Sequence, residues 1–128
     1  MNRYIIQGIL QDLTNGRDVL FVDLNLTQAR RAHDAVIGRL HANGVADRYR
    51  WSSSNGSTWI RDKQTGAAAT FTSLQSTTAD HTDAYVLVVN NYRGMIDGPK
   101  VWGATGPNKA AFDRIRDLTD QRDTVLID

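Results

Sequence analysis

The stretch that decides the fold is Tyr85–Asn91, which reads YVLVVNN. An unbroken run of mostly β-branched residues predicts a strand that is buried on both faces, as in the centre of a parallel α/β sheet. Asn90 and Asn91 end this run, where open α/β sheets place their functional residues. A sheet that hydrolyses nucleotides would carry carboxylates there, but the chain has no glutamate and all 14 of its acidic residues are aspartates. The stretch therefore predicts an α/β architecture that lacks the acidic groups of such a site.

Length and composition describe an ordinary globular chain. Its 128 residues, 41% of them hydrophobic, are enough for one domain, 1–128, with its own core. A net charge of +1 means that any nucleic-acid binding has to come from a local basic patch. Cysteine is absent, which excludes disulfides, a thiol nucleophile and Cys-ligated zinc. No apolar run has the length of a membrane span and no signal-peptide pattern opens the chain, so the expected location is cytoplasmic.

The remaining elements follow from periodicity and turn signals. Apolar stripes predict amphipathic helices at 3–14, 27–42 and 107–118, the second of them capped by Asn25 or Thr27. Apolar runs predict strands at 18–24, 84–90, 100–104 and 123–127 in one mainly parallel sheet. Tyr92–Gly98 is expected to be a Gly-rich loop.

The middle of the chain has a different character. Short strands rich in Arg and Trp, at 48–52 and 57–62, flank an Asn-Gly turn and lead into a third extended segment at 67–74. This pattern predicts an antiparallel hairpin region at the edge of the sheet, with Trp59 and Phe71 pointing inward. The whole order predicts an α/β three-layer sandwich with a mainly parallel sheet, P-loop NTPase-like or Rossmann-like, plus the antiparallel hairpin region.

Taken in order, several stretches resemble the RecA-like ATPase core of helicases and phage large terminases. GRDVLFVDLNLTQARRAHDAVIGRL resembles its second strand and helix, and RWSSSNGSTWIRDKQTGAAATFTSL resembles the hairpin and strand that follow in terminases. YVLVVNN then stands where the Walker B strand would be, and VWGATGPNKAAFDRIRDL is similar to the next strand, turn and helix. The helix at 3–14 would match the helix after the phosphate-binding loop.

The chain also departs from that family. No strand and glycine loop precede residue 3, so the Walker A segment is absent, and Asn90 and Asn91 replace the two Walker B acids. Neutral amides do not supply the charge that holds Mg²⁺, nor a general base for the attacking water. The resemblance therefore implies a degenerate ATPase core that has the fold without the hydrolysis.

The strongest binding candidates lie on the hairpin: Arg48, Arg50, Trp51, Trp59 and Arg61. On paired strands these basic and aromatic groups would alternate, which suits phosphate contacts and base stacking. The same residue types are frequent hot spots of protein interfaces. The structural alternative is that the tryptophans belong to the core and the arginines to an ordinary polar rim.

Other polar residues give weaker indications. Asp23 ends an apolar strand at the functional end of the sheet, where it would serve either a site or the turn into the next helix. His33 is expected to be packed and hydrogen-bonded. Asp80, His81 and Asp83 are too few to complete a metal shell, and Gly103–Lys109 lacks the spacing of a P-loop, which favours a structural turn over a phosphate site.

Together these observations favour a non-catalytic binding module of phage or mobile-element type, built on a terminase-like fold. Its expected partner is another protein or DNA, and neither a cofactor nor a metal is expected. One alternative is a nucleotide- or nucleic-acid-processing enzyme that uses Asp23. Another is a passive nucleotide binder at Gly103–Lys109.

Overall fold

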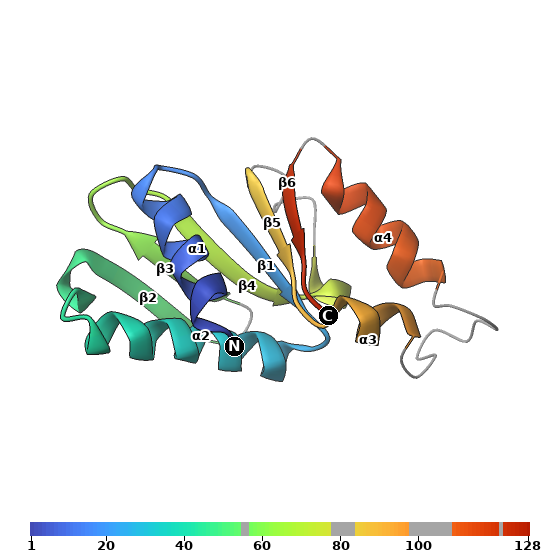
Figure 1. The fold of residues 1–128 in the computed structure, drawn as a ribbon, viewed down its shortest axis with the longest axis horizontal. Helices are drawn as coiled ribbons and strands as arrows, with labels where there is room; N and C mark the ends of the chain where they lie inside the picture. The colour runs from blue at the N-terminus through green and yellow to red at the C-terminus, as the bar shows by residue number, and fades with distance from the viewer. Residues whose placement is uncertain (55–56, 78–83, 98–108, 121) are drawn as a thin grey trace.

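The computed structural model describes residues 1–54, 57–77, 84–97, 109–120 and 122–128 (Figure 1). The α-helices are α1 (Arg3–Thr14), α2 (Leu26–Ala42), α3 (Tyr92–Asp97) and α4 (Lys109–Thr119). Two single-turn 3-10 helices are η1 (Ala46–Arg48) and η2 (Leu74–Ser76). The strands are β1 (Val19–Asp23), β2 (Tyr49–Ser54), β3 (Ser57–Asp62), β4 (Ala68–Ser73), β5 (Val86–Val89) and β6 (Asp123–Leu126).

The described strands form one six-stranded sheet in the order β2-β3-β4-β1-β5-β6. β4, β1, β5 and β6 run parallel to one another, whereas β2 and β3 form an antiparallel hairpin that pairs with β4. The expected α/β class and the mainly parallel sheet with its antiparallel region are confirmed. β5 is an interior strand, as YVLVVNN predicts, and β6 is a parallel edge strand.

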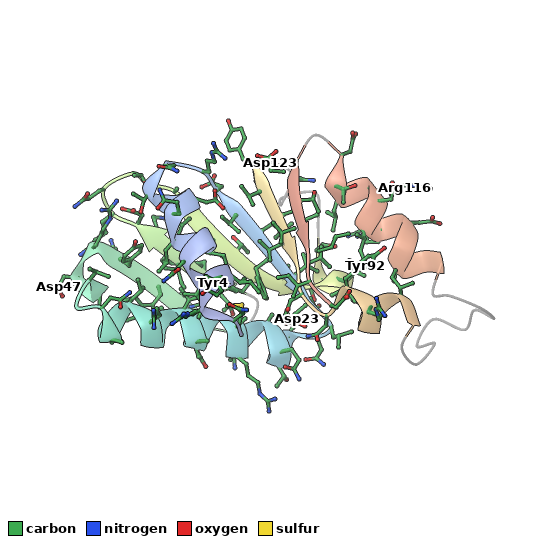
Figure 2. The ribbon with its side chains drawn as sticks, in the orientation of Figure 1. Tyr4, Asp23, Asp47, Tyr92, Arg116 and Asp123 are labelled. Atoms are coloured by element: carbon green, nitrogen blue, oxygen red, sulfur yellow. The ribbon has the colours of Figure 1, made fainter. Side chains whose placement is uncertain are left out.

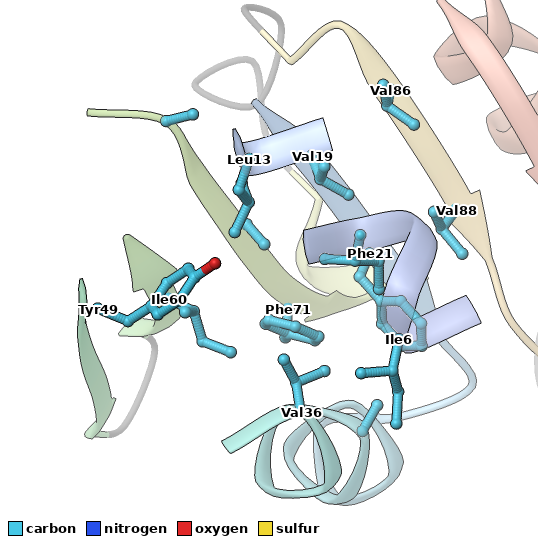
Figure 3. Close-up of a cluster of buried hydrophobic side chains, with 14 of the residues drawn as sticks. Ile6, Leu13, Val19, Phe21, Val36, Tyr49, Ile60, Phe71, Val86 and Val88 are labelled. Carbon is cyan, nitrogen blue, oxygen red and sulfur yellow. The ribbon is translucent and has the colours of Figure 1, made fainter. Parts of the chain in front are cut away.

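Helices lie on both faces of this sheet. α1 and α2 cover one face, where Phe21 and Phe71 pack against Ile6 and Val36 from the two helices (Figure 3). α3 and α4 pack on the other face, where Met95 and the α4 residues Ala111 and Ile115 meet the alternate side chains of β1 and β5. These alternate side chains are Leu20, Val22, Leu87 and Val89.

The second face is only half covered within the described part of the chain. α3 and α4 lie at the β5–β6 end of the sheet, away from β2 and β3 (Figure 1). The apolar cluster that they form includes no residue of β2 or β3. None of the described helices therefore covers the β2–β4 half of this face, where a parallel α/β sheet usually has a helical layer.

Local signals place the start of α2 and the C-terminal ends of α1 and α2 within one residue of the expected positions. Asn25 caps α2, because its Oδ1 accepts a hydrogen bond of 2.8 Å from the backbone N–H of Gln28. Gly16 and Gly44, which follow α1 and α2, adopt φ angles of +79° and +70° that glycine tolerates without strain.

The antiparallel region lies at the sheet edge as expected, with β2 outermost. Residues 67–74 join it to the parallel strands, because β4 pairs with β3 on one side and in parallel with β1 on the other. One expectation about the elements is wrong. Tyr92–Asp97 is the helix α3 rather than a loop, since the apolar side of this segment, Met95, is buried against the sheet. The strand expected at 100–104 lies outside the described residues.

Trp59 also differs from its expected orientation. The structure puts Trp59 opposite Thr70 of β4, on the half-covered face, whereas Phe71 is buried under α2. The two residues therefore lie on opposite faces of the sheet, and only the inward position of Phe71 is confirmed.

We predict that Phe71→Ala lowers the free energy of unfolding by about 3–5 kcal/mol, because it leaves a cavity against Phe21 and His33. Urea denaturation measures this change. The matched control is Tyr4→Ala, an aromatic residue that is 65% exposed, for which we expect a change of at most about 0.5 kcal/mol. Equal losses in the two variants would contradict the interior position of β4.

Candidate functional site

The sheet register aligns two rows of side chains on the open face of β2, β3 and β4. The first row is Arg50, Arg61 and Ala68, and the second row is Ser52, Trp59 and Thr70. The residues that alternate with them, Ile60 and Ala69, belong to the core beneath α1 and α2. The two rows therefore point away from those helices and together form a surface, the open grid.

The two arginines of the open grid are directly opposite each other across the hairpin. Both are exposed, and the side chain of Arg50 makes no hydrogen bond or ion pair within the part of the chain that the structure describes. The guanidinium of Arg61 lies 5.9 Å from the centre of the Trp59 ring, and its Nη1 donates a 2.7 Å hydrogen bond to the carbonyl of Gly66. Arg61 is thus held beside the aromatic ring, while the Arg50 side chain has free donors.

Arg48 does not belong to this surface. Its Nε and Nη2 donate hydrogen bonds of 3.0 and 2.8 Å to Oδ2 of Asp62, which is fully buried. The other oxygen of Asp62 accepts from the backbone N–H groups of Gln64 and Thr65, at 2.8 and 3.3 Å. This ion pair joins the hairpin to the turn before β4, so that Arg48 has a structural role.

Trp51 lies on the face opposite to Trp59. Its ring meets the ring of His41 on α2 edge to face, with 5.6 Å between the centroids. Because successive side chains of a strand point to opposite faces, the residues of the expected constellation do not share one surface. These residues are Arg48, Arg50, Trp51, Trp59 and Arg61. Only Arg50, Trp59 and Arg61 come together on one face.

A second polar cluster closes the C-terminal ends of β1 and β5, around the Asp23 that Figure 2 labels. Oδ1 of Asp23 accepts hydrogen bonds from the backbone N–H of Leu24 at 2.7 Å and from Nδ2 of Asn91 at 2.8 Å. Its Oδ2 accepts from Nδ2 of Asn90 at 2.9 Å. Asp23 is only 1% exposed, so this carboxylate is enclosed by the groups that donate to it.

This cluster lies at the switch point of the sheet. β1 leads into α2 on one face, whereas the adjacent β5 leads into α3 on the other face. Open α/β sheets bind ligands where neighbouring strands diverge in this way. The sequence places Asp23, Asn90 and Asn91 at this end of the sheet, but it does not reveal that the amides donate to the carboxylate.

The conformation of Asn91 brings its amide into the cluster. Its φ angle of 57° is the one positive value among the described non-glycine residues. Asparagine adopts this left-handed region more readily than most residues. Here it turns the chain from β5 into α3 while directing Nδ2 toward Asp23.

No protein-family model, curated protein sequence or solved structure matches this chain.

The other candidates have no ligand geometry in the described residues. No group of three or more His, Cys, Asp or Glu side chains that could hold a metal ion occurs there, and Asp80, His81, Asp83 and residues 103–108 lie outside the described ranges. His33 is packed as expected, with its ring nitrogens 3.1 Å from Oδ1 of Asp34 and 3.2 Å from the carbonyl of Trp59. Within the same ranges, no helix is long and apolar enough to cross a membrane.

A hollow of about 440 Å³ lies at the end of the sheet opposite to Asp23, by the N-terminal ends of β1, β5 and β6. Gly16, Arg17, Tyr85 and Asp123 line it. The guanidinium of Arg17 lies 3.7 Å from Asp123 and 4.0 Å from Asp12, so its charge already faces two carboxylates. Burial raises the pKa of Asp12 above its ordinary value. The hollow therefore has no unpaired cation that could select an anionic ligand.

The Arg48–Asp62 pair makes the stability of the fold depend on pH. Burial by itself raises the pKa of Asp62, but the hydrogen bonds from Arg48, Gln64 and Thr65 together outweigh it and hold the pKa below its ordinary 3.8. A carboxyl whose folded pKa is depressed stabilises the fold above the unfolded pKa, and this stabilisation is lost as the pH falls through the folded value.

We predict that Asp62→Asn lowers the urea midpoint at about pH 7, and that its difference from the wild type shrinks as the pH falls below 3.8. The control is Asp47, the exposed residue before Arg48. We expect Asp47→Asn to leave the urea midpoint unchanged over the same pH range. A difference between Asp62→Asn and the wild type that stays constant down to about pH 3 would contradict the depressed pKa.

Proposed function

We propose that the protein is a non-catalytic binding module that holds its partner on the open grid. The observation that carries this proposal is the pair Arg50 and Arg61, directly opposite each other beside Trp59 on a face that no described helix covers. Like charges in directly opposite positions of a hairpin destabilise it. A partner that supplies negative charge removes this penalty on binding.

The composition of the open grid supports the same proposal. Arg and Trp are the residue types that most often dominate binding energies. Arg61 is already held by Gly66 and the Trp59 ring, so that less side-chain freedom is lost on binding. The hydroxyl groups of Ser52 and Thr70 flank Trp59 and add polar groups around it.

The state of Asp23 argues against the enzyme alternative. A general base has to reach the proton that it removes. Both oxygens of Asp23 accept hydrogen bonds from amides or backbone, and the residue is 1% exposed. The cluster is best understood as a structural clamp that ties β1 to the start of α3.

We also propose that this fold is a degenerate ATPase-like core, P-loop NTPase-like or Rossmann-like in its parallel part and resembling that of phage large terminases. The position of Asn90 and Asn91 at the switch point supports this, because a Walker B strand would carry its acids there. An accessory protein of a phage or mobile element fits the same proposal.

The binding proposal predicts where amide signals shift in an NMR titration. Three probes are added separately: a mixed-sequence single-stranded oligonucleotide, the corresponding duplex, and an acidic peptide. We expect at least one probe to shift the amides of β2, β3 and the first half of β4, with no comparable shifts in α1 or α2. If none of the probes shifts these amides, or if all shifts map elsewhere, the proposal is wrong.

The non-catalytic part is tested by nucleotide turnover. We predict no hydrolysis of ATP or GTP above background, with or without Mg²⁺ and DNA, because Asn90 and Asn91 stand where acids are required. Turnover that disappears in Asp23→Ala would instead establish the enzyme alternative. A melting curve of that variant is the control for loss of folding, since the substitution leaves the Nδ2 groups of both asparagines without their acceptor.

A further inference from the structure

We infer that the open grid takes a single-stranded nucleic acid, with a base stacked on Trp59 and backbone phosphates held by Arg50 and Arg61. This inference rests on the proposed function and specifies the partner that it left open. Three observations carry it: the charge of the open grid, the spacing of its rows and the accessibility of one aromatic ring.

The charge of the open grid is positive and uncompensated. No acidic residue occupies either row. Asp62, the acid of the same hairpin, points to the other face of β3 and is taken by Arg48. A chain with a net charge of +1 therefore presents two adjacent cations at this place, which complements a polyanion.

The rows fit the alternation of phosphate and base. Directly opposite Cβ atoms lie about 4.5–5.5 Å apart, so Arg50 and Arg61 form one compact cationic pair. Trp59 stands two residues from Arg61 along β3, which separates the rows by about 7 Å. A single-stranded nucleic acid whose phosphates contact the arginine row can thus place a base against Trp59 in the second row.

The partly exposed ring of Trp59 favours a single-stranded nucleic acid over a duplex. Trp59 is half-buried, so that part of its ring remains open to a ligand. The bases of a duplex are stacked on one another and offer no free face, whereas unstacked bases of a single strand stack on aromatic side chains of sheets.

A protein partner fits the open grid less well. The centre of a protein interface is depleted of charge and enriched in apolar groups. In the two rows, Trp59 is the one large apolar residue, and Ala68 is the other apolar member. The remaining positions are two arginines and two hydroxyl residues, which suit a polar and charged ligand.

The test is fluorescence anisotropy with a labelled mixed-sequence oligonucleotide of about 12 nucleotides, long enough for one such site. We expect binding that weakens about sevenfold between about 50 and 200 mM salt, which is the dependence of two phosphate contacts on a single strand. The unlabelled duplex should compete more weakly than the unlabelled single strand.

Variants locate the site. Arg50→Gln with Arg61→Gln should abolish most of the salt dependence and weaken binding at low salt. Arg3→Gln with Arg31→Gln changes the net charge equally, at exposed residues of α1 and α2, and should leave the affinity within about twofold.

The aromatic contact has its own pair of variants. Trp59→Leu should weaken binding at least about fivefold through lost stacking, whereas Trp51→Leu on the opposite face should not. Trp59→Phe keeps an aromatic ring and should retain most of the affinity, which separates stacking from loss of folding.

Other results overturn the inference in distinguishable ways. If the duplex binds as tightly as the single strand, or if only the acidic peptide shifts the amides of β2 and β3, the inference is wrong and the proposed function stands. Equal losses in both double variants also contradict it, since they indicate a diffuse electrostatic effect. If none of the three probes engages the open grid, both the inference and the proposed function fall.

Discussion

The parallel pairing of β1 with a strand on each side is the constraint on which the rest of the structure depends. β1 pairs with β4 and with β5, and all five of its residues are buried. Its last residue is Asp23, whose charge would be costly to bury without donors. Asn90 and Asn91 supply those donors from the end of β5. The polar side chains of this cluster therefore hydrogen-bond to one another and hold β1 and the end of β5 together.

The same pairing determines which part of the sheet the described helices leave uncovered. α1 and α2 cover one face, and α3 and α4 follow β5 onto the other face at its β5–β6 end. The hairpin of β2 and β3 extends the sheet beyond α3 and α4 (Figure 1). A buried carboxylate and an open basic face are therefore two results of one topology. The first stabilises the sheet, and the second is where we place binding.

Much of the architecture could be predicted from the sequence because its signals are local. The double-sided apolarity of YVLVVNN, the stripes of α1, α2 and α4, and the cap at Asn25 depend on neighbouring residues only. The position of β4 could not be predicted in this way, since its parallel pairing with β1 joins residues about 50 positions apart, such as Phe21 and Phe71. The sequence does not predict α3, because Gly94 and its polar neighbours resemble a loop and the burial of Met95 depends on tertiary packing.

In the candidate site, too, local sequence signals predict the elements, whereas tertiary contacts decide the role of each side chain. The Arg- and Trp-rich hairpin can be identified from the sequence, but the parity of its strands decides which side chains share a face. Trp51 contacts His41 on α2, whereas Trp59 lies beside Arg61 on the other face. Arg48 lies outside the open grid because it pairs with Asp62. None of these partners can be assigned from composition or alternation, since both faces of the hairpin carry aromatic and basic residues.

The claim that the β2–β4 half of the sheet is the binding face is tested most directly by hydroxyl-radical footprinting with residue-level mass spectrometry. The two tryptophans of the hairpin report on its two faces in the same molecule. We predict that Trp59 and Trp51 are both oxidised in the free protein. A saturating single-stranded oligonucleotide should then protect Trp59 from oxidation but not Trp51. Protection of Trp51 instead, or a Trp59 that is already as protected as Phe21 in the free protein, would contradict the account.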